Sequence, residues 1–176
     1  MRRFSIITSP ALWVGVFFTA LLFGMPQLAP AFEWSFPGVS PPVFERGSFF
    51  ALWLSHAGLV LAASGAATVL GMVLAIFVTR PAGRDFRSLV STLAAVGQTF
   101  PPAAVLALAV PALGFGPRPT IVALFLYGLL PIIENAIAGL EGVPGATREA
   151  ARGMGLSPWQ LLRDVDLPLA APVILA

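Results

Sequence analysis

The sequence predicts an all-α membrane protein, a helical bundle of about four complete transmembrane helices plus the start of a fifth. The first observation is composition, since 57% of the 176 residues are hydrophobic and only 10% are Asp, Glu, Lys or Arg. Soluble domains average about 25% charged residues, so these charges are too few to cover a water-facing surface. The other two observations are the lengths of the apolar segments and the placement of arginine between them.

Four apolar segments are long enough to cross a membrane, which takes about 20 residues of helix. They are residues 10–30, 49–78, 88–113 and 120–140. Prolines interrupt the first, third and fourth, and membrane helices tolerate such breaks where neighbouring helices satisfy the freed backbone groups. A fifth apolar segment occupies residues 167–176, so we expect the chain to be truncated at its C-terminus relative to a complete bundle.

The first apolar segment has two interpretations. Residues 1–48 are predicted to form an N-terminal transmembrane helix and an external loop, ahead of the main transmembrane domain at 49–176. The basic start, the apolar run and the sequence Ala29-Pro30-Ala31 also resemble a cleavable signal peptide. A proline at the would-be cleavage site favours the membrane helix.

Arginine predicts the orientation of the chain. All ten basic residues are arginine, and eight of them fall at the N-terminus or after the second and fourth spans: Arg2, Arg3, Arg80, Arg84, Arg87, Arg148, Arg152 and Arg163. The other two loops hold only Arg46 and Arg118. Because cytoplasmic loops carry an excess of basic residues, the N-terminus and residues 141–166 are predicted to be cytoplasmic in a multi-pass protein of the inner (plasma) membrane.

The second span has a face of small residues. It comprises Gly65, Ala66, Ala67, Gly71 and Ala75. Small side chains let helix backbones approach closely in membranes, so this face is predicted to pack against another helix.

The longest polar passage, EAARGMGLSPWQLLRDVDLP at residues 149–168, predicts two short helices joined by a turn. Thr147 can cap the first helix, which places Glu149 at its second position. A carboxylate there favours the positive end of the helix dipole. Gly155 can end this helix in a left-handed conformation.

The second short helix is predicted to start at Ser157, which can form a Ser-x-x-Gln capping box with Gln160. Three apolar residues fall on one face at a spacing of three: Trp159, Leu162 and Val165. From the pattern alone, the two helices fit an amphipathic interfacial connector as well as an element on which another protein docks. The small side chains of Ala150 and Ala151 would let such a partner approach closely.

This passage resembles the EAA loop of ABC-importer permeases. Their pattern is EAA, three residues, G, nine residues, then I-x-L-P. The matching positions are Glu149, Ala150, Ala151, Gly155, Val165, Leu167 and Pro168, with Val165 for the usual Ile. The wider stretch from about residue 50 to residue 176 is similar to permeases of osmoprotectant importers, which take up glycine betaine, choline or carnitine. We refer to residues 141–168 as the EAA loop.

The resemblance implies part of a type I ABC-importer permease, the translocation subunit of an ATP-driven importer. Its partners would be a dimer of cytoplasmic ATPase subunits that dock on the EAA loop, an extracytoplasmic solute-binding protein, a second permease copy or paralogue, and membrane lipid. The chain contains no lysine and therefore no P-loop, so ATP hydrolysis must come from a separate subunit. Glu149 and Arg152 are three residues apart and can pair with each other or with the ATPase.

Polar residues and prolines within the spans are candidates for a translocation path. They are Gln98, Thr99, Pro101, Pro102, Glu134 and Asn135. The first four break the third span near its middle, where exposed backbone carbonyls can face a cation. The alternative interpretation is a kink that serves only helix packing. An ionisable group such as Glu134 is costly in hydrocarbon and is a functional candidate, with a helix–helix hydrogen bond as the alternative.

No catalytic residue, metal site or cofactor is predicted. The chain has no Cys and one His, which excludes a thiolate nucleophile and a Cys-ligated metal. Basic residues form no cluster beyond short loop groups, which argues against nucleic-acid binding. Two alternatives to a permease are an intramembrane enzyme, for which the spans lack a dense set of reactive side chains, and a small structural or scaffold membrane protein, including a non-functional permease fragment.

Overall fold

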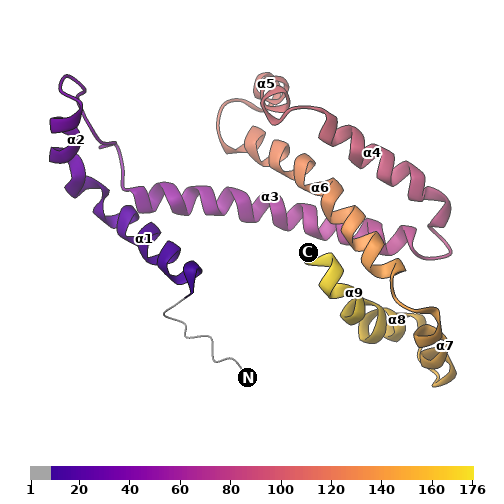
Figure 1. Ribbon diagram of the computed structural model, residues 1–176. Coiled ribbons are helices and arrows are strands. Elements are labelled where there is room, and N and C mark those ends of the chain that lie inside the picture. The colour runs from indigo at the N-terminus through magenta and orange to yellow at the C-terminus, as the bar shows by residue number, and fades with distance from the viewer. Residues whose placement is uncertain (1–8) are drawn as a thin grey trace. The chain divides into compact units, whose positions relative to one another are not determined.

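The computed structural model describes residues 9–176, and the regular elements within this range are all helical (Figure 1). The chain divides into two compact units, one ending at Gly58 and the other running from Leu59 to Ala176. The predicted all-α architecture is confirmed. The predicted cytoplasmic position of Arg2 and Arg3 lies outside the described residues.

The first unit contains one long apolar helical stretch, Pro10–Ser35. It consists of α1 (Pro10–Gly24), a short 3-10 helix (Met25–Leu28) and α2 (Ala29–Ser35). The predicted end of this span at residue 30 is wrong, because the helix continues to Ser35. Pro26 and Pro30 are each the second residue of their helix, within the first turn, where N–H groups have no intrahelical acceptor.

Helix α3 (Phe49–Val78) has the bounds that the sequence predicts. Its buried residues recur every three or four positions: Ala63, Ala67, Gly71, Ala75 and Val78. Gly71 lies close to α6 (Pro117–Glu141), because a Cβ added there would lie 2.7 Å from Ile132 Cγ2. Gly65 and Ala66, also predicted for this face, are exposed. They lie off the stripe that a period of 3.6 residues brings against α6.

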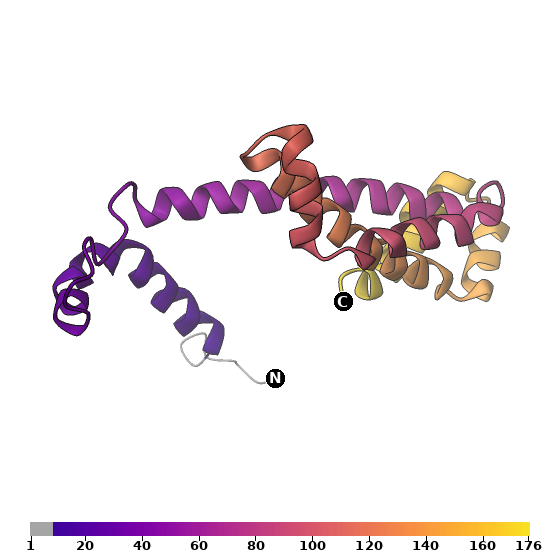
Figure 2. The same cartoon turned by 90° about the horizontal axis from the view of Figure 1, so that it is seen from above.

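The predicted third span is two helices, α4 (Arg87–Thr99) and α5 (Pro102–Leu113). They meet at an angle of 89° at the predicted proline break, and the bend is visible in Figure 2. Pro101 precedes the first residue of α5 with an extended ψ of 139°. Three helical stretches of the described chain are long and apolar enough to span a membrane, and the bent pair makes up to four, in agreement with the predicted number.

Two clusters of buried residues hold the second unit together. The first joins α3, α4 and α6 through Ala75, Val78, Ala94, Ile133, Ala136 and Ile137. The second joins the end of α6 to the EAA loop and to α9 (Leu167–Ile174) through Leu140, Val143, Leu162 and Ala170. At Gly139 an added Cβ would lie 3.0 Å from the Ala170 carbonyl oxygen, so α6 and α9 are also in close contact. The EAA loop is thus packed onto the end of α6.

Candidate functional site

The EAA loop folds into two short helices and a wide turn. Helix α7 (Gly145–Gly153) is followed by α8 (Pro158–Leu161), by a π-helical turn (Leu162–Asp166) and by α9. Figure 1 shows these elements at the end of the second unit where α3 and α6 end and α4 begins. We refer to this end of the second unit as the arginine-rich end, because Arg80, Arg87 and Arg148 make their ion pairs there.

The predicted start of α7 is wrong. The helix begins at Gly145, and Thr147 lies inside it rather than at its cap. The reason is Pro144, whose extended backbone precedes the helix and whose carbonyl oxygen accepts hydrogen bonds from the Thr147 and Arg148 N–H groups. The helix dipole acts most strongly on a carboxylate in the first turn. Glu149 is the fifth helical residue and therefore lies beyond that turn.

The end of α7 is as predicted. Gly155 has a φ of +88°, in the left-handed region. Its N–H group donates to the Arg152 carbonyl at 2.9 Å, and the Leu156 N–H donates to the Ala151 carbonyl at 3.2 Å. This pair of bonds is a Schellman motif, which satisfies helix carbonyls that would otherwise lack donors.

The predicted capping box at the start of α8 is confirmed. The Ser157 N–H donates to Gln160 Oε1 at 2.9 Å, and the Gln160 N–H donates to Ser157 Oγ at 3.4 Å. The predicted apolar face is wrong for Trp159, which is 65% exposed, whereas Leu162 is buried and Val165 is half-buried. In the π turn each N–H bonds one residue further back than in an α-helix, and Asp166 at its end is buried as well.

The matched EAA positions differ in exposure. Glu149, Ala150, Gly155 and Pro168 are exposed, Val165 and Leu167 are half-buried, and Ala151 is buried. Of the two pairings open to Glu149 and Arg152, the one with each other does not form, since no ion pair among residues 9–176 includes either side chain. The first half of the motif therefore leaves a carboxylate and a small side chain open to a partner.

The polar centre of the loop is Asp166, which is fully buried. Its Oδ1 accepts from Arg148 Nε and its Oδ2 from Arg80 Nη2, each at 2.8 Å. Arg148 Nη2 also donates to the Leu140 carbonyl oxygen, near the end of α6. This site was not predicted from the sequence. An acidic residue between apolar Val165 and Leu167 was the available signal, but its partners lie 18 and 86 positions away.

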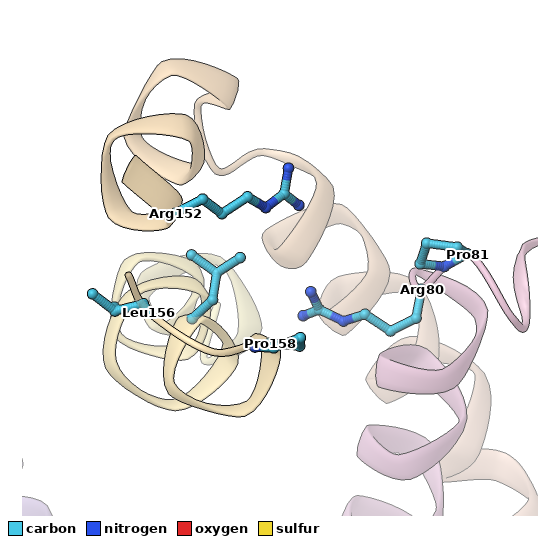
Figure 3. A pocket seen from close by; sticks show the side chains of 6 residues that line it. Arg80, Pro81, Arg152, Leu156 and Pro158 are labelled. Carbon is cyan, nitrogen blue, oxygen red and sulfur yellow. The ribbon is translucent and has the colours of Figure 1, made fainter. Parts of the chain in front are cut away.

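A cavity of about 320 Å³ lies between the end of α3 and the EAA loop. Its lining residues are Arg80, Pro81, Arg152, Leu156, Pro158 and Leu161. Figure 3 shows the Arg80 and Arg152 side chains extending toward one another from opposite walls. The buried Nε of Arg80 has no hydrogen-bond partner within the described chain.

The residues predicted for a translocation path lie on α4, α5 and α6 or at the break between α4 and α5. Gln98 Nε2 donates to the Tyr127 carbonyl of α6 at 2.7 Å, and Thr99 Oγ1 donates to the Val96 carbonyl of its own helix at 2.7 Å. Pro101 and Pro102 form the break between α4 and α5. On α6, Glu134 is exposed and Asn135 is half-buried.

The arginine-rich end carries two further surface ion pairs. Arg87 Nη1 lies 2.7 Å from Glu141 Oε1, which connects the start of α4 to the end of α6. Arg163 pairs with the adjacent Asp164 at 2.7 Å, and that carboxylate raises the pKa of the Arg163 guanidinium. Exposed pairs of this kind contribute little to stability.

Residues 67–176 match the family described as binding-protein-dependent transport system inner membrane component. The osmoprotectant import permease protein OsmY of Salmonella typhimurium is 47% identical over 121 residues, 69% of this chain and 51% of that protein. The choline transport system permease protein OpuBB of Bacillus subtilis is 49% identical over 79 residues, 45% of this chain and 36% of its own length. The glycine betaine/carnitine/choline transport system permease protein OpuCB of the same organism is 46% identical over 79 residues, with the same coverage of 45% and 36%.

The matched segment contains the whole EAA loop, all of α6 and most of the α3 stripe. The chain spans about half the length of OsmY. The matches confirm the predicted resemblance to ABC-importer permeases, and they do not favour the scaffold alternative.

Proposed function

The chain belongs to the family of inner membrane components of binding-protein-dependent transport systems, and on that premise we propose that it is a permease subunit of an ATP-driven osmoprotectant importer. The observation that carries the proposal is the folded EAA loop. Its two halves are fixed at the arginine-rich end by a Schellman turn, a capping box and the buried Asp166 network.

We propose that the exposed first half of the EAA loop couples the spans to the ATPase. Glu149 and Ala150 are open to solvent on α7, while Ala151 is buried beneath them. The second half, Val165, Leu167 and Pro168, leads from the loop into α9. A partner that binds one conformation of such a loop better than another shifts the spans between states. Gly155 would set the angle between the two halves.

The proposed partners follow from this role. A dimer of cytoplasmic ATPase subunits would bind the EAA loop, and a solute-binding protein would deliver solute on the opposite side. A second permease copy or paralogue would complete the pathway, surrounded by membrane lipid. The apolar helices Phe49–Val78 and Pro117–Glu141 support the membrane setting.

The proposed substrate is glycine betaine or a related quaternary ammonium compound. The names of the three relatives support this class, because they describe osmoprotectant import, choline transport and glycine betaine/carnitine/choline transport. We further propose that the α4–α5 break, with Gln98, Thr99, Pro101 and Pro102, contributes to the pathway. Glu134 and Asn135 of α6 are additional candidates, because ionisable and polar groups inside spans commonly line such paths.

The proposed topology has the N-terminus and the EAA loop in the cytoplasm. Ion pairs that place Arg80, Arg87 and Arg148 together at one end support a common side for these arginines. The proposed domain division keeps residues 1–48 as an N-terminal helix and external loop, and residues 49–176 as the permease domain. The family match from residue 67 supports assigning the second part to the permease domain.

The function is tested by solute-stimulated ATP hydrolysis and uptake in vesicles that hold the permease, its ATPase and its binding protein. We expect Glu149→Lys to lower both, because it reverses the charge of an exposed side chain on α7. Solute capture by the binding protein should be unchanged. Asp85→Lys is the matched control, since Asp85 is also exposed but lies between α3 and α4. Full stimulation of the Glu149→Lys complex would exclude Glu149 from coupling.

A further inference from the structure

One carboxylate connects four helical elements at the arginine-rich end. Asp166 ends the π turn that leads into α9, Arg148 belongs to α7, and Arg80 follows the end of α3 by two residues. Each Asp166 oxygen accepts from a different arginine at 2.8 Å, and Arg148 continues to the Leu140 carbonyl of α6. The Asp166 side chain is fully buried, so the guanidinium groups of these two arginines compensate the charge of its carboxylate.

The two arginines perform different tasks. Arg148 lies 18 positions from Asp166 and joins the two halves of the EAA loop to each other. Arg80 lies 86 positions away and joins the loop to the end of the long helix α3. Removing Arg148 would therefore disturb the loop itself, whereas removing Arg80 would leave the loop intact and break only its ion pair with the end of α3.

We infer that Asp166 is a positioning residue that makes the EAA loop and the end of α3 move as one body through Arg80. This inference rests on the proposed function, because a moving loop matters only if the loop is coupled to an ATPase. When the partner displaces α7, the Arg148–Asp166 and Asp166–Arg80 ion pairs transmit the displacement to α3. Apolar contacts between Ile76 of α3 and the cluster of Leu140, Val143, Leu162 and Ala170 would accompany this link but allow sliding.

Arg80→Gln is the informative variant, because the loop retains its Arg148–Asp166 pair. In the complete complex we expect normal co-purification with the ATPase and normal basal hydrolysis. Solute transported per ATP hydrolysed should fall about fivefold or more, the range of a broken allosteric coupling. Arg80→Lys, which keeps a cation beside Asp166, should recover part of this ratio. Arg163→Gln is the matched control, because that arginine pairs only with exposed Asp164 on the same loop.

A distance measurement separates positioning from stability. The chain has no cysteine, so spin labels can be attached at Ala82→Cys, after α3, and at Ala146→Cys, on α7. We expect one narrow distance distribution in the wild type and in Arg163→Gln, and a broadened one in Arg80→Gln. Asp166→Asn should broaden it as well, provided that it assembles.

The results distinguish this inference from the proposed function. A wild-type complex with no solute-stimulated hydrolysis would contradict the proposed function, and the label distances would still decide whether Arg80 and Asp166 hold the loop. The positioning role would be overturned if the wild-type complex shows solute-stimulated hydrolysis and Arg80→Gln matches Arg163→Gln in both transport ratio and label distances. A lowered ratio with broadened distances supports it.

Discussion

The side chain of Gln98 on α4 satisfies a carbonyl of Tyr127 on α6, at 2.7 Å. In an α-helix that carbonyl accepts from the N–H group four residues later, but this position is Pro131, which has none. A proline within one span is therefore compensated by a polar side chain from another. This contact gives Gln98 a structural role in joining α4 to α6, whether or not solute passes it.

Gln98→Leu should destabilise the second unit, because it leaves the Tyr127 carbonyl without a donor in an apolar setting. The expected cost is about 1–3 kcal/mol. Pro131→Ala returns an N–H group to α6, so the same Gln98→Leu change should cost less in the Pro131→Ala background. Thermal unfolding in detergent of the four proteins of this cycle provides the measurement. An equal cost in both backgrounds would show that the hydrogen bond is not what Gln98 contributes.

Gly71→Ala should lower stability by about 1–3 kcal/mol, because the added methyl group would meet Ile132 Cγ2 at 2.7 Å and force α3 away from α6. Gly65→Ala is the control on the same helix, since nothing lies within 4 Å of an added Cβ there. Detergent melting temperatures of both variants test the contact. If the two variants melt alike, the α3–α6 crossing is not as close as described.

Gly155→Ala should cost about 1–2 kcal/mol, because an L-residue is strained at its φ of +88°. The change should also alter the angle between α7 and α8 and so weaken recovery of the ATPase during co-purification. Gly153→Ala offers a control two residues earlier, where the backbone is helical and the space around an added Cβ is open. Equal recovery for the two variants would argue that the left-handed turn has no part in docking.

The predicted topology is tested with single cysteines in this cysteine-free chain. Phe115 lies between α5 and α6 and is 95% exposed, and Met154 ends α7 and is 75% exposed. We expect an impermeant thiol reagent to label Phe115→Cys from the outside of intact cells and Met154→Cys only after permeabilisation. Labelling of Met154→Cys in intact cells would contradict both the orientation and the coupling role of the EAA loop.

Features that depend on neighbours within a few residues were predictable from the sequence. The bounds of α3, the break at Pro101 and Pro102, the left-handed Gly155 and the Ser157–Gln160 capping box are all confirmed. Each follows from apolar length, from a missing N–H group, from the missing Cβ of glycine or from a side chain that reaches a backbone group three residues away. The start of α7 was missed although it is local, because Pro144 and Thr147 both fit a helix start and the proline carbonyl supplies the first bonds.

The sequence by itself determined a membrane protein with a break in one span and an EAA loop, through composition and the spacing of the motif, and its arginine placement predicts a cytoplasmic position for that loop. Only the tertiary structure decided which polar groups meet. Asp166 and Arg80 are 86 residues apart, and Gln98 and Tyr127 are 29 apart. Such pairs form because a buried charge or a freed carbonyl must find a partner where packing brings one. Helix packing, rather than spacing along the chain, determines which side chain that is.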